Sequence, residues 1–135
     1  MNFLNNCYMQ KNNIILTKSY QFAICIIQLY QKLSSENKEY NLSKQLLRSG
    51  TSPGANIEEG LSSQSRKDFI SKFSIALKES KEAHYWLRLL RDSNYISQEI
   101  ANDYLRDCEE LIKILTSILK TSRQTNDTKI INYQL

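Results

Sequence analysis

The residues that could carry acid–base or metal chemistry are sparse in this sequence. Its one histidine, His84, follows Glu82 by two positions. Carboxylate-bridged di-iron bundles need Glu-x-x-His pairs, so the spacing of this pair does not fit. Helical ribonucleases of the HEPN type place an arginine a few residues before a histidine, whereas only Lys78 and Lys81 precede His84 at that range. We therefore interpret His84 as a partly buried structural residue.

The other groups that enzymes use are missing or incomplete. No serine shows the partners of a Ser-His-Asp arrangement. The glycines at positions 50, 54 and 60 match neither a phosphate-binding nor a dinucleotide-binding loop. We expect no enzyme activity, no catalytic residue, no metal site and no cofactor. One acidic set could hold a metal, but without further ligands its members are better interpreted as surface charges or partners for lysine and arginine: Glu58, Glu59, Glu79 and Glu82.

The composition is that of a single domain without secretion or membrane signals. The chain has 135 residues, of which 41% are hydrophobic and 24% are charged, as in ordinary globular proteins. No apolar run approaches the length of a membrane span, and no signal peptide is evident. Three cysteines without a Cys-x-x-Cys spacing argue against a disulfide framework. We expect a cytoplasmic protein with one domain over residues 1–135, an ordered core at about 15–122, flexible termini and no membrane partner.

Four segments carry the helical periodicity of apolar residues. They span residues 17–33, about 41–59, 66–93 and 97–122. Asn41 or Ser43 would suit as the N-cap of the second segment, Ser65 of the third and Ser97 of the fourth. Four amphipathic helices joined by short links are typical of an antiparallel up-down bundle. We therefore predict an all-α protein with this architecture.

The first segment is apolar around almost its whole circumference. Phe22, Ile26 and Leu29 lie on one face, and Ile24 and Ile27 lie on another. A helix of this kind is buried on more than one side. We expect it either at the centre of the bundle or at a subunit interface.

The second segment holds every glycine and the only proline of the chain: Gly50, Pro53, Gly54 and Gly60. A proline inside a helix lacks the N–H that the preceding turn needs, and its ring clashes with that turn. We predict that the second helix is kinked or broken near Pro53.

A helical projection of residues 66–93 gives that helix one basic flank. Net charge is +4 over the whole chain, with +4 in residues 1–57, −3 in 58–110 and +3 in 111–135. Clustered lysine and arginine attract nucleic acid because binding releases its counterions. The candidate nucleic-acid-binding residues are Lys44, Arg48, Lys67, Lys81 and Arg88.

The opposite flank of the same helix carries apolar residues among acidic ones. Ile75, Trp86 and Leu89 point away from the predicted core stripe in this projection. An exposed apolar patch on a helix indicates a partner surface. We predict that these three residues form an oligomer interface, and the alternative is that the first helix or a terminus covers them.

Two stretches of the sequence are similar to the conserved segment of a known family. They are SGTSPGANIEEG and KDFISKFSIALKESKEAHYWLRLL, and the most specific parts are Asn56-Ile57-x-Glu59-Gly60 and SIALKE at 74–79. On these residues the chain resembles the bacterial four-helix bundle proteins, also called ribosomal-RNA intervening-sequence proteins, over about residues 15–120. Relatives of that family include the accessory variability protein of diversity-generating retroelements. One departure is Pro53, where the family usually has an aliphatic residue.

The resemblance implies an up-down four-helix bundle that assembles as a homopentameric ring. For the retroelement relative it also implies a basic surface that binds nucleic acid and a reverse transcriptase. Asn56, Glu59 and Gly60 are then structural residues near the corner between the second and third helices, with a binding role as the alternative.

These observations lead to two hypotheses about function. The first is a non-enzymatic, ring-forming bundle whose basic surface binds RNA, DNA, or a ribonucleoprotein or reverse-transcriptase partner. The alternative is a structural or scaffold protein that binds another protein and has no nucleic-acid role.

Overall fold

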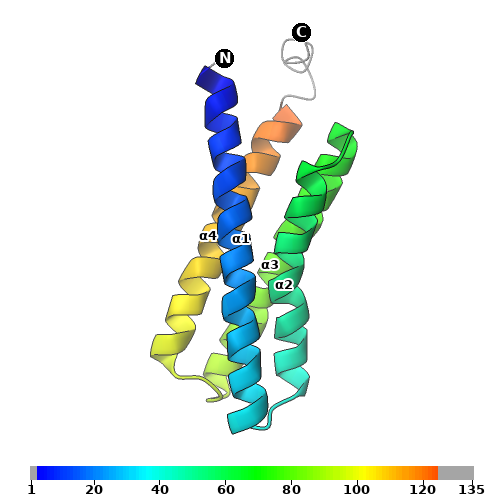
Figure 1. Ribbon diagram of the computed structural model, residues 1–135. Helices are drawn as coiled ribbons and strands as arrows, with labels where there is room; N and C mark the ends of the chain where they lie inside the picture. The colour runs from blue at the N-terminus through cyan, green and yellow to red at the C-terminus, as the bar shows by residue number, and fades with distance from the viewer. Residues whose placement is uncertain (1–2, 125–135) are drawn as a thin grey trace.

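Four antiparallel helices form the protein in the computed structural model (Figure 1), which describes residues 3–124, with side chains from residue 14 onward. They are α1 (Phe3–Glu36), α2 (Asn41–Leu61), α3 (Arg66–Asp92) and α4 (Gln98–Gln124). Successive helices run in opposite directions. The prediction of an all-α up-down four-helix bundle is therefore confirmed. No helix among the described residues is long and apolar enough to cross a membrane.

The core runs along the inner faces of all four helices. Ile26 of α1, Leu46 of α2, Phe73 of α3 and Leu115 of α4 are fully buried in it. Because these residues recur at helical spacing within each segment, each helix turns one apolar stripe inward.

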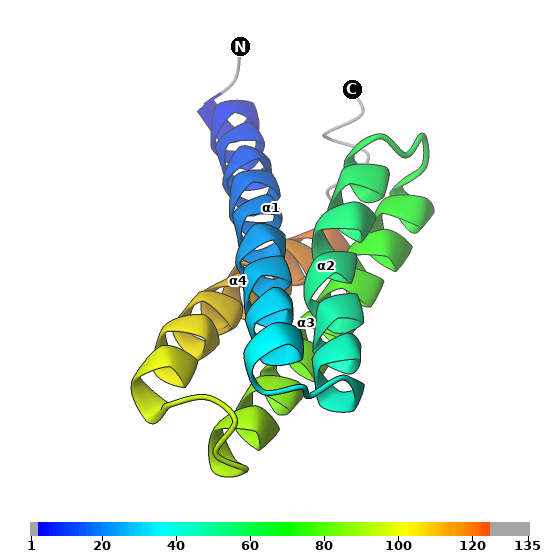
Figure 2. The ribbon, with the colours of Figure 1, turned by 60° about the horizontal axis from the view of Figure 1, so that its bottom comes forward.

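The four helices are not joined equally. Contacts between consecutive helices are extensive, whereas α1 and α4 touch over a much smaller surface. In both views of the ribbon α4 crosses behind α1 (Figures 1 and 2). Tyr104 on α4 donates a hydrogen bond to the carbonyl oxygen of Cys25 on α1 at 3.1 Å, and Lys18 pairs with Glu110 at 2.9 Å. These polar contacts fasten an otherwise loosely packed side of the bundle.

Helix α1 begins at Phe3, well before the predicted start at Thr17. Ile15 is fully buried in the bundle core, so the apolar run Ile14-Ile15-Leu16 belongs to the helix. Most helical stability in proteins comes from such tertiary burial. The residues before this run are mostly polar, so the apolar periodicity of the sequence does not reveal the true start of the helix.

Helix α2 continues without interruption through Pro53. The predicted break is therefore wrong, and a kink is not seen there. A proline in a helix interior costs about 3 kcal/mol, but Pro53 is fully buried with Leu46 and Ile57 on the same face of α2. This burial holds the helix together where its local sequence opposes it.

The glycines of α2 permit close helix packing and do not act as helix breakers. All three have negative φ angles. A Cβ added at Gly60 would lie 2.7 Å from Cδ1 of Phe73 on α3, which is closer than side chains pack. Gly60 therefore lets α2 and α3 meet at their shared corner.

The helix starts follow the sequence in two cases and differ in one. The Ser65 hydroxyl accepts a hydrogen bond from the N–H of Asp68 at 3.1 Å, and Ser97 does the same for Ile100 at 3.2 Å, so both predicted N-caps are confirmed. At α2 neither Asn41 nor Ser43 is the cap. Glu39, which precedes the helix, caps it with its carboxylate instead.

Candidate nucleic-acid interface

The outward face of α3 carries a row of exposed cations, which we name the basic stripe: Lys67, Lys78, Lys81 and Arg88. The face exists because α3 turns Phe73, Ala83 and Leu87 into the core. Contacts with α2 cover one flank of α3 and contacts with α4 cover the other. The basic stripe therefore extends for about 30 Å along the remaining solvent side of the helix.

The cations of the basic stripe are not held in close ion pairs within the described part of the chain, although Arg88 interacts electrostatically with Asp92. None of the four forms an ion pair with another residue in the described part of the chain. The acidic side chain at the end of this face, Asp92, is paired with Arg91 at 2.8 Å. That hydrogen bond lowers the pKa of the Asp92 carboxyl. The basic stripe is thus available to an external anion.

Arg48, by contrast, is engaged within the protein. Its guanidinium on α2 bridges two carboxylates of α3, Glu79 at 3.0 Å and Glu82. Burial would raise the pKa of Glu82, but hydrogen bonds from Arg48 and from the Trp86 indole hold it below its ordinary value. Lys44, one turn earlier on α2, is exposed. The five predicted residues therefore fall on two surfaces, with Lys44 and Arg48 apart from the basic stripe.

The predicted oligomer patch is only partly open. Ile75 is 39% exposed, whereas Trp86 and Leu89 are half-buried. Trp86 packs against the hydrophobic core, and its indole N–H donates to Glu82 at 3.2 Å. Trp86 therefore already has partners inside its own chain, and a role of this patch in assembly stays a prediction.

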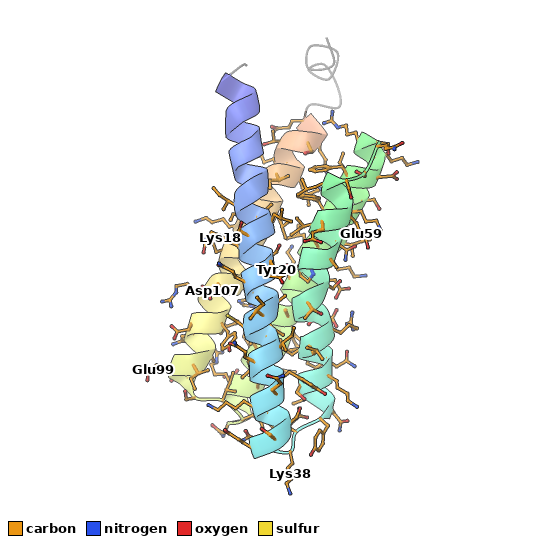
Figure 3. All side chains as sticks on the ribbon, in the orientation of Figure 1. Lys18, Tyr20, Lys38, Glu59, Glu99 and Asp107 are labelled. Carbon is orange, nitrogen blue, oxygen red and sulfur yellow. The ribbon has the colours of Figure 1, made fainter. Side chains whose placement is uncertain are left out.

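A larger exposed apolar surface lies on α1. The face of α1 turned away from the core holds Ile24 and Ile27, which are about two-fifths exposed, and Tyr20, labelled in Figure 3. The helix is thus not at the centre of the bundle. The other sequence alternative for α1, a subunit interface, stays a prediction.

An apolar groove also lies between α1 and α4. Its lining comes from both helices: Ile14, Lys113, Ile114 and Ser117. We name the exposed face of α1 together with this groove the α1 face.

Sequence reasoning missed two residues beside the basic stripe. Tyr85 is 47% exposed between Lys81 and Arg88, and its spacing from Lys78 and Arg88 could have revealed it. Arg123, near the end of α4, donates to the Ser74 hydroxyl on α3 at 3.1 Å. Its position depends on how α4 packs on α3, so no local pattern announces it.

The motif residues at the end of α2 make short-range contacts. The Asn56 amide donates to the backbone oxygen and the hydroxyl of Ser52, both at 3.0 Å. Glu59, labelled in Figure 3, forms an ion pair with Lys72 on α3 at 2.7 Å. With Gly60 against Phe73, these contacts set the geometry of the α2–α3 corner.

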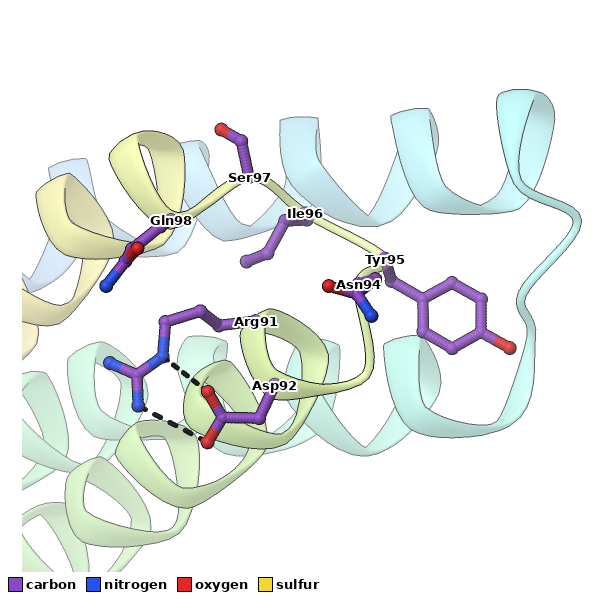
Figure 4. Close-up of a pocket in the computed structure, with 7 residues that line it drawn as sticks. All are labelled: Arg91, Asp92, Asn94, Tyr95, Ile96, Ser97 and Gln98. Atoms are coloured by element: carbon purple, nitrogen blue, oxygen red, sulfur yellow. Dashed lines mark hydrogen bonds and ion pairs between the residues drawn. The ribbon is translucent and has the colours of Figure 1, made fainter.

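Two other places bring polar side chains together. A polar pocket at the α3–α4 turn contains the Arg91–Asp92 pair beside Tyr95 and Ser97 (Figure 4). His84 contacts Glu109 across α3 and α4 at 3.0 Å. Among the described residues no group of three or more histidine, cysteine or acidic side chains could hold a metal ion.

Comparison with known proteins agrees with the fold. The family described as 23S rRNA-intervening sequence protein matches residues 11–117. A solved structure from Bacteroides thetaiotaomicron, described as a protein of unknown function from the S23 ribosomal protein family, is similar at 50% identity. The similarity covers 82% of this chain and 98% of that chain, with a TM-score of 0.80. No curated protein matches the sequence. On the match over most of its length, the chain belongs to the 23S rRNA-intervening sequence protein family.

Proposed function

We propose that this protein is a non-enzymatic, oligomeric helical bundle that binds nucleic acid through the basic stripe of α3. The observation that carries the proposal is the row of four exposed cations without ion-pair partners in the described chain. Binding a phosphate to a cation that already has a carboxylate partner would break that ion pair, and the broken pair would oppose binding. Cations without partners can bind phosphates and release the counterions of the nucleic acid.

Binding of this kind is directed at the sugar–phosphate backbone. Contacts from lysine and arginine to phosphates position a nucleic acid but carry little sequence information. The family takes its name from 23S rRNA, and its solved relative is placed with a ribosomal protein family. Both descriptions make RNA the first ligand to test, with DNA as the second.

We also propose that copies of the chain associate through the α1 face. Contiguous exposed apolar patches mark protein interaction sites. A contact between two different surfaces of the same chain closes into a ring when its rotation permits. The homopentamer implied by the family resemblance is such a ring, and a reverse transcriptase or a ribonucleoprotein is a candidate further partner in the cytoplasm.

The test of nucleic-acid binding is a salt series with a matched charge control. We expect wild-type protein to bind a 30-nucleotide RNA at about 50 mM salt and to weaken steeply by about 200 mM. The variant Lys81→Glu/Arg88→Glu should lose this binding. The control Lys32→Glu/Arg106→Glu changes net charge equally on exposed positions outside the basic stripe. No binding by wild type, or equal loss in both variants, would refute the proposal.

The second candidate function is a scaffold that presents a protein partner and binds no nucleic acid. The apolar α1 face favours it, since that surface suits protein contact and not phosphate.

Light scattering separates the roles of the two apolar surfaces. We expect Ile24→Glu/Ile27→Glu to shift an oligomer to the monomer, and Trp86→Glu tests whether the predicted patch of Ile75, Trp86 and Leu89 also takes part in assembly. An oligomer that survives the first variant would remove the α1 face from the subunit contact.

A further inference from the structure

Tyr85 interrupts the basic stripe with an aromatic ring. Lys78, Lys81, Tyr85 and Arg88 succeed one another at intervals of three, four and three residues. On an α-helix this spacing puts all four side chains on one face. The tyrosine therefore has two cations in the turns before it and one in the turn after it.

Two neighbours hold the ring of Tyr85 in place. The Arg88 guanidinium carbon lies 5.8 Å from its centroid, in a cation–π contact. The Trp86 ring meets it edge-on, with centroids 5.2 Å apart and an interplanar angle of 66°. Because Trp86 itself is packed against the core, the Tyr85 ring is supported from inside the protein. A supported ring loses little side-chain entropy when a ligand stacks on it.

The other exposed tyrosines lie in different surroundings. Tyr20 is on α1, Tyr40 precedes α2 and Tyr95 is at the α3–α4 turn. Among the described residues, Tyr85 is the exposed aromatic that falls within the basic stripe. Its apolar neighbours, Trp86 and Leu89, are half-buried, whereas the fully exposed side chains next to it on this face are Lys81 and Arg88.

We propose that Tyr85 is a stacking platform for an unpaired base, so that the ligand of the basic stripe is a single-stranded nucleic acid. This inference rests on the proposed function and narrows its ligand. Bases in a duplex are stacked on each other and show only their edges, whereas unpaired bases can lie on an aromatic ring. Lys78 and Lys81 would hold phosphates on one side of the stacked base and Arg88 on the other.

The experiment compares three ligands of matched sequence: a single-stranded RNA 20-mer, the same strand as DNA, and the RNA duplex. We expect Tyr85→Leu to bind the single strands about 10-fold more weakly, the size of one lost base–aromatic contact. The slope of binding against salt should not change, because the cations remain. Tyr85→Phe should bind like wild type, and so should Tyr95→Leu, the control for loss of an exposed tyrosine.

A strand with abasic sites at every second position separates stacking from a purely structural effect of Tyr85→Leu. A structural effect would weaken binding of the intact strand and of the abasic strand equally. Wild type should bind the abasic strand more weakly than the intact strand. The difference in affinity between the two strands should be smaller for Tyr85→Leu. Loss confined to RNA or to DNA supports stacking and identifies the sugar. Equal loss on duplex and single strands overturns the inference, as does an unchanged affinity of Tyr85→Leu. In those cases the proposed function stands if Lys81→Glu/Arg88→Glu abolishes binding and Lys32→Glu/Arg106→Glu does not, and it fails if wild type shows no salt-dependent binding or if both variants lose it equally.

Discussion

A Cβ placed on Gly50 of α2 would lie 2.7 Å from both Cγ1 and Cγ2 of Ile26 on α1. Side chains do not approach each other so closely, and Ile26 is fully buried. The two helix backbones are therefore held at a separation that glycine permits and no other residue does. This contact fixes α1 against α2. The position of α1 depends on it, because α1 has no extensive contact with α4.

Gly50→Ala is expected to destabilise the protein by about 1–3 kcal/mol, the range measured when an extra methyl group is forced into a packed core. Urea denaturation followed by circular dichroism measures the loss. Gly54→Ala is the matched control, because its added Cβ would meet Ser19 at 3.4 Å. There the better helix propensity of alanine offsets a milder contact. Equal losses in both variants would show that the Gly50–Ile26 contact is not the cause.

Glu39→Gln should weaken the start of α2 by about 1 kcal/mol at neutral pH, the usual effect of losing a helix cap. The buried Glu39 carboxylate accepts hydrogen bonds from the backbone N–H groups of Asn41, Leu42 and Ser43 at 2.7–3.0 Å. Urea denaturation at pH 7 measures the loss. Glu36→Gln is the control, since Glu36 is exposed at the end of α1.

The same carboxylate should make stability depend on pH. Burial alone would raise the pKa of Glu39, but the backbone hydrogen bonds lower it. A lowered folded-state pKa contributes stability above the unfolded-state value, about 4.3, and the contribution is lost as the pH falls through the folded-state pKa. The free energy of unfolding should therefore fall less steeply below about pH 4 in Glu39→Gln than in wild type. Parallel curves would contradict this account.

Arg48→Ala should affect nucleic-acid binding less than Lys81→Ala. Arg48 is paired with Glu79 and Glu82, so its charge is already balanced, whereas Lys81 has no ion-pair partner in the described chain. The Arg48 side chain is 53% exposed, and loss of such a surface ion pair costs at most about 1 kcal/mol of stability. Fluorescence anisotropy with labelled RNA would compare the two variants. A larger loss in Arg48→Ala would place the ligand on α2.

Cys108 should resist thiol reagents in the folded protein. Burial raises the pKa of this thiol to about 12, and its Sγ donates to the carbonyl oxygen of Ser80 at 3.1 Å. In a Cys7→Ser/Cys25→Ser background we expect no labelling at pH 8 until guanidinium unfolds the chain, because only the thiolate reacts. Adding Ser71→Cys on the exposed side of α3 supplies a control that labels at once. Rapid labelling of Cys108 itself would show that the core opens.

The helices themselves were predictable from the sequence. Apolar spacing located the four segments, and Ser65 and Ser97 marked two starts correctly, because periodicity and capping are local properties. Pro53 was misjudged because its cost is local while its burial is tertiary. For the same reason the role of the glycines was missed, since the residue that each one approaches belongs to another helix.

The candidate site was predictable only in part. The projection of α3 placed Lys67, Lys81 and Arg88 on one flank, and they do lie along one exposed face. Arg48 was grouped with them because a sequence shows charge but not pairing across helices. Trp86 was expected to point away from the core. Its contacts with the core and with Glu82 depend on how the surrounding residues pack, which the sequence does not show.

The unequal helix contacts have a consequence for how the chain folds. The pairs with extensive contact, above all α2 with α3, are consecutive in the sequence, and α1 with α4 is the weakest of the pairs in contact and the most distant one. Contacts between nearby segments need little loop closure, and proteins rich in them fold fast. We therefore expect this bundle to assemble from the middle of the chain outward. Its first and last helices should be the last to meet.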